Sequence, residues 1–129
     1  MIKIISISIV TVSVLFSSLV FAGGHSKGMY IHIINFNITG IDRSQYEGVA
    51  MQATSAFAAV PGLIRKHWLA NEENNTYGGV YIFDSKESHD AFVESELYAG
   101  VRGNPSFSNF SGKSFENIDS LAKHTRGTE

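Results

Sequence analysis

Apolar and polar positions in the first half of the chain repeat with two different periods. Residues 29–38, MYIHIINFNI, are β-branched and aromatic and end at a Thr-Gly pair, which predicts a mostly buried first strand. Asp42 then stands three residues before Gln45, as in a capping box, and apolar side chains recur every three or four residues until the Pro-Gly pair at 61–62. This spacing predicts a helix that buries one apolar stripe against a sheet.

The middle of the chain predicts two strands joined by a polar turn. The second strand runs from Leu63 to Ala70 and the third from Thr76 to Phe83, with the turn at residues 71–75 between them. Strands this close in sequence pair as an antiparallel hairpin with a longer loop.

The remaining pattern predicts a second helix and a last strand. Asp84 and Glu87 form another capping box at the start of the helix, and the last strand covers residues 111–118. The order β-α-β-β-α-β is the ferredoxin-like arrangement, an α+β fold in which both helices cover one face of an antiparallel sheet. The other face is left uncovered, which in a chain of about 107 residues once residues 1–22 are removed favours burial against a second copy in a two-fold homodimer.

The N-terminal segment has the pattern of an export signal. One early lysine precedes an uncharged apolar and serine-containing stretch, and Val20 and Ala22 stand at the small-residue positions that a signal peptidase favours. The alternative is a retained membrane anchor, because residues 4–22 are about long enough to span a bilayer. The predicted organisation is a cleaved signal peptide at 1–22, a flexible tail at 23–28, one folded domain at 29–118 and a second flexible tail at 119–129.

Composition narrows the classes of partner. The chain has 129 residues, 43% of them hydrophobic, which fits one ordinary globular domain. It has no cysteine, so an exported form contains no disulfide and no lipid-modified cysteine. Removing Lys3 leaves nine basic residues against twelve acidic ones, and this mildly acidic balance argues against nucleic acid as a partner. We expect no stable membrane association once the signal is cleaved, and a periplasmic or secreted location.

One stretch carries a family resemblance. Residues 61–83, PGLIRKHWLANEENNTYGGVYIF, resemble small bacterial mono-oxygenase-like proteins of the dimeric α+β barrel superfamily, the antibiotic-biosynthesis-mono-oxygenase-like group. IINFNITGIDRSQYEGVA before this stretch and SELYAGVR after it extend the likeness to about residues 29–118. The positions that carry it are Pro61, Gly62, Lys66, Trp68, Gly78, Gly79, Tyr81 and Phe83.

The resemblance implies a ferredoxin-like subunit paired sheet to sheet with another, with a pocket between each sheet and its helices. It implies a mono-oxygenase that uses no cofactor, neither metal nor flavin, and oxidises a small phenol, quinol or anthrone-like aromatic with O₂. Haem-degrading enzymes belong to the same superfamily, so a haem-binding barrel that uses Asn35, Trp68 and His89 is one alternative. A non-catalytic periplasmic module that binds a small molecule is another. The export signal departs from the usual pattern of the family.

Aromatic side chains on the predicted hairpin suggest where a ligand would bind. With a four-residue loop, Trp68 lies opposite Gly79 and Lys66 opposite Tyr81 on one face of the sheet. The indole either covers the bare backbone of the glycine or, with Tyr77 and Tyr81, borders a flat notch for a planar aromatic ligand. Both interpretations predict that Trp68 is buried.

Three further polar residues are candidates for binding the substrate. Asn35 and Asn37 share a face of the first strand, where they either satisfy a bulge or nearby backbone or bind a ligand oxygen. Arg102 would either hold an anionic substrate or contact the acidic end of the second helix.

Histidines are the candidate bases for removing a phenolic proton. His32, His67 and His89 titrate near neutral pH when unperturbed, and each also fits a purely structural role. No HxH, HExxH or carboxylate cluster indicates a metal site, and no phosphate-binding or dinucleotide-binding glycine motif is present.

Overall fold

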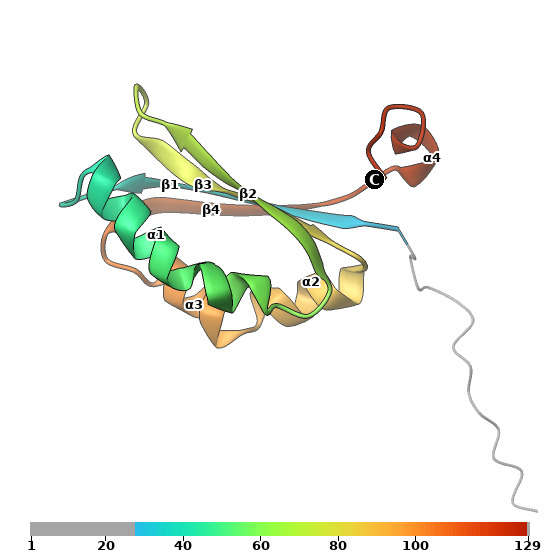
Figure 1. Cartoon of the computed structure of the whole chain (residues 1–129), viewed down its shortest axis with the longest axis horizontal. Helices are drawn as coiled ribbons and strands as arrows, with labels where there is room; N and C mark the ends of the chain where they lie inside the picture. The colour runs from blue at the N-terminus through green and yellow to red at the C-terminus, as the bar shows by residue number, and fades with distance from the viewer. Residues whose placement is uncertain (1–27, 129) are drawn as a thin grey trace, which may run out of the picture.

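Four antiparallel strands form one sheet with the order β2-β3-β1-β4 (Figure 1). The computed structural model describes residues 28–128. This strand order is that of the ferredoxin-like α+β fold and confirms the fold class predicted from the sequence. The strands are β1 Tyr30–Ile38, β2 Leu63–Asn71, β3 Thr76–Phe83 and β4 Phe107–Glu116.

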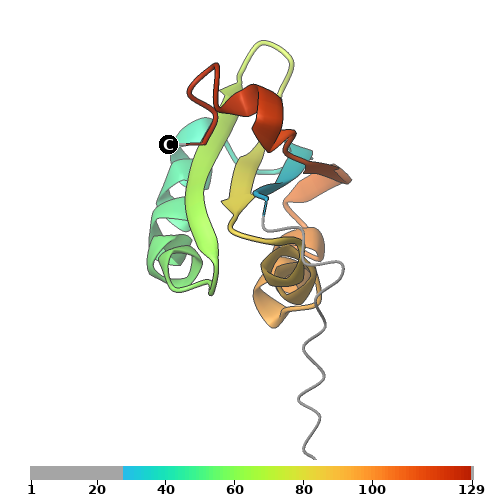
Figure 2. The ribbon, with the colours of Figure 1, turned by 90° about the vertical axis from the view of Figure 1, so that its right-hand side faces the viewer.

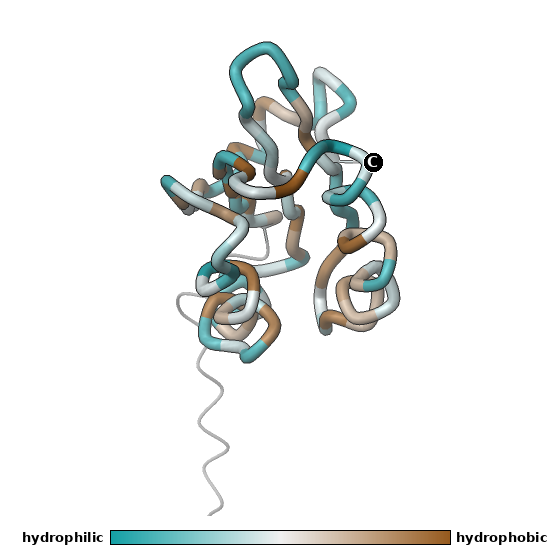
Figure 3. Tube along the Cα trace, turned by 90° about the vertical axis from the view of Figure 1, so that its left-hand side faces the viewer, coloured by the Kyte–Doolittle hydropathy of each residue, from teal (hydrophilic) through white to brown (hydrophobic). Residues whose placement is uncertain are grey.

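Among the described residues, three helices cover one face of the sheet, and none lies over the other face (Figures 1 and 2). Helix α1 (Arg43–Ala58) lies beside β2, while α2 (Lys86–Val93) and α3 (Glu96–Arg102) lie next to each other beneath the other strands. The hairpin loop between β2 and β3 is hydrophilic, whereas hydrophobic positions gather on the strands and on the helices beneath them (Figure 3).

The core lies between the sheet and the helices. Side chains of β1 alternate, so that Ile34 and Phe36 are buried against the helices while Ile33 and Asn35 face the uncovered side. The other strands and helices add aromatic side chains to the same layer. The buried core consists of Ile34, Phe36, Ile38, Tyr46, Phe57, Tyr77, Tyr81, Phe83, Phe92 and Tyr98.

Gly78 holds β3 unusually close to β1. Its φ is +155°, and a Cβ at this position would lie 1.8 Å from the carbonyl oxygen of Ile34. Only glycine fits such an approach of two strands.

The predicted cap of α1 is confirmed, whereas the predicted cap of α2 is wrong. Asp42 Oδ1 accepts the backbone N–H of Gln45 at 2.8 Å, and Gln45 Oε1 accepts the N–H of Asp42 at 2.9 Å. At α2 the capping residue is Ser85, whose hydroxyl accepts the N–H of Ser88 at 3.2 Å. The carboxylate of Asp84 instead accepts hydroxyl hydrogen bonds from both serines, and therefore lies outside the helix.

The region after α2 forms a helix that the sequence pattern did not predict. Helix α2 ends at Val93, and α3 begins after Ser95, whose hydroxyl accepts the backbone N–H of Tyr98 at 3.2 Å. The glycine in α3 lowers its intrinsic helix propensity, but the serine cap and the burial of Tyr98 compensate.

Strand β4 begins four residues earlier than predicted. The register between β1 and β4 shifts between Asn35 and Asn37, and Asn109 has a φ of +52° at this irregularity. The bulge extends the pairing to Phe107, whose ring stacks on that of Phe36 with centroids 4.1 Å apart.

A short helix follows the last strand. Helix α4 (Asp119–Ala122) follows β4 within the segment predicted to be a C-terminal tail. The predicted signal peptide and residues 23–27 lie outside the described residues. Within residues 28–128, every helix is too short or too polar to cross a bilayer.

Candidate functional site

A cavity of about 290 Å³ lies between the sheet and helices α1 and α3. This is close to the lower end, roughly 300 Å³, of the volumes at which small-molecule pockets are found. Glu96, Asn104 and Lys66 are polar groups among its lining residues. Its walls are otherwise mainly apolar, and they include the aromatic side chains of Phe36, Tyr46, Phe57, Trp68, Tyr81 and Phe107.

Lys66 extends along this aromatic wall from β2. Its Nζ lies 2.9 Å from the centroid of the Trp68 ring, 4.6 Å from that of Phe57 and 4.7 Å from that of Tyr81. No carboxylate of the described residues 28–128 forms an ion pair with this ammonium. Burial in these surroundings lowers the pKa of Lys66 to about 7, so that much of the amine is neutral near neutral pH.

The hairpin register confirms the predicted pairs, but the predicted burial of Trp68 is wrong. Trp68 pairs with Gly79 and Lys66 with Tyr81, on the helix-facing side. The indole is nevertheless 42% exposed, because β2 is at an edge of the sheet and the ring stands edge-on to Phe57 at the rim of the cavity. A Cβ on Gly79 would lie 3.2 Å from Lys66 Nζ, so the glycine leaves room for the lysine amine.

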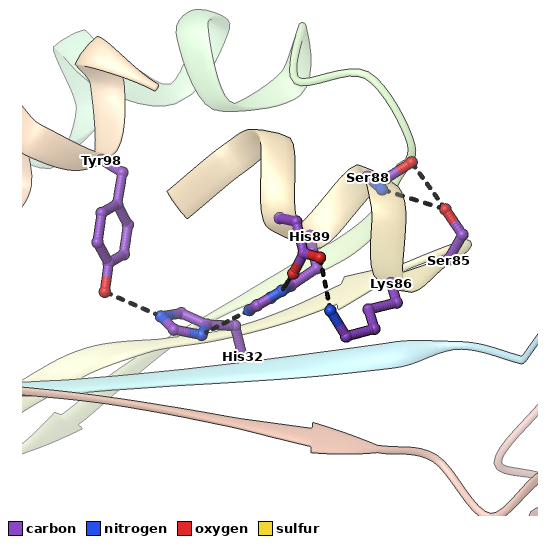
Figure 4. A network of polar contacts seen from close by, with 7 residues as sticks. His32, Ser85, Lys86, Ser88, His89 and Tyr98 are labelled. Atoms are coloured by element: carbon purple, nitrogen blue, oxygen red, sulfur yellow. Dashed lines mark hydrogen bonds and ion pairs between the residues drawn. The ribbon is translucent and has the colours of Figure 1, made fainter. Parts of the chain in front are cut away.

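His32, His89 and Tyr98 form a buried polar chain next to the cavity (Figure 4). The Tyr98 hydroxyl lies 3.1 Å from His32 Nε2, and His32 Nδ1 lies 3.1 Å from His89 Nε2. His89 Nδ1 lies 2.9 Å from Asp90 Oδ1, and Lys86 Nζ donates to the other carboxylate oxygen at 2.6 Å. The chain of hydrogen bonds therefore joins β1, α2 and α3 and reaches the surface at Asp90.

His32 is neutral in this chain at neutral pH. Burial, helped by the charge of nearby His89, lowers the pKa of His32 to about 4. Both ring nitrogens of His32 and both of His89 already have a hydrogen-bonding partner. Neither residue lines the cavity, and His67 lies exposed on the opposite face of the sheet, paired with Val80. The structure therefore places none of the three predicted bases on the cavity wall.

The predicted polar binding residues also lie elsewhere. Asn35 and Asn37 are on the uncovered face; Asn37 donates to the carbonyl of Asn75 at 2.7 Å and accepts from Asn109 at 2.8 Å, which satisfies the bulge. Arg102 is exposed at the end of α3 and does not line the cavity.

Tyr77 is 2% exposed beneath Tyr46, and it too is absent from the cavity wall. Of the predicted binding residues, Lys66, Trp68 and Tyr81 are the three that come together. Because Asn35 is on the other face and His89 has both nitrogens bonded, the structure does not assemble the residues named for haem. The described residues contain no cluster of His, Asp and Glu that could hold a metal ion.

Several lining residues were not identified from the sequence. Tyr46 and Phe57 were predicted only as part of an apolar helix stripe, although two aromatic rings on that stripe could have indicated a wall. Phe107 was missed because the start of β4 depends on a bulge. Leu97 and Val101 reach the cavity from α3, which was not predicted as a separate helix.

Comparison with known proteins agrees with the fold. The model of the family described as "Putative mono-oxygenase ydhR" matches residues 31–128. No curated protein matches the sequence.

Several solved structures share the fold at low sequence identity. One is SnoaB, a cofactor-independent oxygenase from Streptomyces nogalater, at 16% identity and a TM-score of 0.57, with 70% of this chain and 94% of that one covered. A second, described as a "putative antibiotic biosynthesis monooxygenase" from Caulobacter crescentus, has 14% identity and a TM-score of 0.58, with 73% of this chain and 93% of that one covered. MhuD, solved with two manganese protoporphyrin IX molecules per active site, has 20% identity and a TM-score of 0.56, covering 69% and 94%.

Proposed function

Because this chain belongs to the ydhR mono-oxygenase family, we propose that it oxidises a small aromatic molecule with O₂ and needs no cofactor to do so. The substrate class is an electron-rich phenol, quinol or anthrone. The alternative that sequence leaves open, a module that only binds such a molecule, is an outcome of the experiment below.

The cavity supplies the binding surface. Trp68, Phe57 and Tyr81 present aromatic surfaces around the Lys66 amine, which suits a planar ring whose hydroxyl meets this amine. Trp68 at the rim lies where a ring can enter without displacing the core.

Lys66 is the proton acceptor in this proposal. A neutral amine within the cavity takes the phenolic proton, and the resulting ammonium stays beside the phenolate and stabilises it. The aromatic anion passes one electron to O₂, and the two radicals combine at a ring carbon to give a peroxide anion. This anion takes the proton back from the Lys66 ammonium and becomes a hydroperoxide, so that the amine is neutral again. For an anthrone CH₂ group, loss of one water then leaves a carbonyl, so that one O₂ yields one ketone and one water. The protein holds the ring, excludes water and accepts the proton.

The observation that carries the proposal is the Lys66 amine in an aromatic cavity, with no ion-pair partner among residues 28–128. The test is O₂ consumption by purified protein with a panel of hydroquinones and anthrones, compared with Lys66→Met. We expect the variant to lose at least about a hundredfold in kcat/KM, the lower end of the range typical for a general base. Lys123→Met, which removes an exposed lysine near α4, is the matched control and should be unaffected.

Two results would overturn this assignment. Substrate-dependent uptake that is equal in wild type and Lys66→Met would remove the lysine from the mechanism. Saturable binding of the same compounds with no uptake above buffer would leave a binding module.

The uncovered face of the sheet supports a two-fold homodimer. Rows of side chains across it pair Ile31 with Ile82 and Phe115, and Ile33 with Val80, and Phe115 is 47% exposed. An apolar sheet face of this kind is usually buried against another surface. We also place the activity outside the cytoplasm, because residues 1–22 have the composition of a signal peptide.

A further inference from the structure

The cavity amine differs from a typical surface lysine in what surrounds it. Lys66 Nζ lies among three aromatic rings and has no ion-pair partner among residues 28–128. Lys86 offers the opposite environment, because its exposed Nζ is 2.6 Å from Asp90 Oδ2 and this contact raises its pKa. Of these two amines, Lys66 is the one whose nitrogen lone pair is available at neutral pH.

The space around Lys66 Nζ permits attack on a bound carbonyl group. Residue 79 is a glycine, and the amine lies above its bare backbone, 3.2 Å from where a Cβ would be. The indole of Trp68 closes one side of the nitrogen, while the cavity lies on another. A carbonyl carbon in the cavity can therefore meet the nitrogen without displacing a side chain at position 79.

We infer that Lys66 captures aromatic aldehydes by condensing with them to an imine inside the cavity. The nitrogen lone pair forms a C–N bond to the carbonyl carbon and gives a carbinolamine. The two hydrogens of the neutral amine then leave with the carbonyl oxygen as one water, and a C=N bond remains. No electrons are transferred to or from another reagent, so the step needs neither oxidant nor cofactor.

The walls of the cavity favour aryl over alkyl aldehydes. An imine conjugated to an aromatic ring is flat, and it can stack against the rings of Trp68 and Phe57 that flank the nitrogen. An aliphatic aldehyde gains no such contact. The lowered pKa of Lys66, about 7, supports the inference, because only the unprotonated amine is nucleophilic.

Reductive trapping tests this inference without any oxidation chemistry. The full-length protein is incubated under nitrogen at pH 7 with 2-naphthaldehyde and sodium cyanoborohydride, digested, and mapped by mass spectrometry. We expect the naphthylmethyl adduct on Lys66 to exceed that on Lys86 by at least about tenfold, because about half of the Lys66 amine is neutral at this pH. The labelling of Lys66 should rise to half its maximum near pH 7.

The controls distinguish labelling that depends on the cavity from the general reactivity of lysine amines. Acetaldehyde in place of naphthaldehyde should reduce the preference for Lys66 severalfold, and Lys66→Arg should abolish the cavity adduct while its circular dichroism spectrum stays that of wild type. Equal labelling of Lys66 and Lys86 in wild-type protein would overturn the inference, and this comparison does not depend on any variant folding. Because O₂ is absent, trapping and the proposed oxygenase activity succeed or fail separately.

Discussion

At the scale of single residues, burial of the Lys66 amine lowers the stability of the fold and at the same time makes the amine more reactive. A cation surrounded by aromatic rings loses much of its hydration, and the contacts with the three ring faces return only part of it. The lowered pKa of Lys66 expresses this balance, since the folded protein favours the neutral amine more strongly than the unfolded chain does. A residue kept in such surroundings is a typical candidate for function.

Lys66→Met should therefore make the protein more stable. At pH 7 we expect the free energy of unfolding to rise by about 1–3 kcal/mol, because a buried charge is replaced by an apolar chain of similar length. The folded pKa is about 7 and the unfolded one the ordinary 10.5, so wild type regains the missing stability as pH rises between them. The gap between the two proteins should narrow from pH 7 to about 9.5 in urea unfolding experiments. A gap of zero, or one independent of pH, would contradict this view, and Lys123→Met serves as the control.

The burial of Trp68 is the residue-scale property that the sequence could not supply. The same hydrophobic pattern describes a strand inside a sheet and a strand at its edge, and only the complete strand order places β2 at the edge. The pairing of Trp68 with Gly79 was predictable because a hairpin loop of known length fixes the register.

At the scale of elements, the polar chain from Tyr98 to Asp90 connects α3, β1 and α2. Each of its buried members has a hydrogen-bonding partner, and no buried polar side-chain atom among the described residues is left unsatisfied. Such a network is stable while His32 stays neutral, because protonating His32 would place a charge in a buried site.

Lowering the pH should weaken the hydrogen-bonded chain through His32 before it disrupts most contacts that depend on carboxylates. His32 has a folded pKa of about 4, below the ordinary 6.5, so its contribution to stability is complete above pH 6.5 and is lost as pH falls toward 4. The loss is on the order of 3 kcal/mol. Urea unfolding of wild type and His32→Gln between pH 7 and 4.5 checks this expectation. Parallel pH profiles of the two proteins would show that His32 does not carry the effect.

Elements with strong periodicity were predictable, and those fixed by tertiary contacts were not. Strands β1 and β3 and helix α1 follow from apolar spacing and one capping box. Helix α3 depends on Ser95 as a cap and on burial of Tyr98, and the start of β4 depends on a bulge opposite Asn37. These contacts join residues far apart in the sequence, so local patterns do not encode them.

At the scale of the whole molecule, the two faces of the sheet differ in what they contribute to the proposed function. The helix-covered face contains the cavity and the polar chain, while the uncovered face presents apolar rows from β1, β3 and β4. If two copies meet through this second face, each cavity lies on the outer side of its own sheet, away from the contact. Association would then leave both cavities accessible.

Ile33→Lys tests this arrangement. Ile33 lies at the centre of the uncovered face, between Val80 and Lys113, so a second cation there places like charges together in the proposed contact. We expect sedimentation to show a dimer for wild type and a monomer for the variant, with unchanged circular dichroism. Met51→Lys, at a site 71% exposed on α1, should remain dimeric. A monomeric wild-type protein would exclude the contact altogether.

The edge position of β2 has a consequence for aggregation. A strand with an unpaired side offers backbone groups to which any extended peptide can add, and natural sheets block such growth with charge and irregular pairing. Strand β2 has both features, since the cation of Arg65 is exposed on it and the register slips between Leu63 and Arg65. Strand β2, which contributes Lys66 and Trp68 to the cavity, therefore also opposes the addition of further strands that would lead to fibrils.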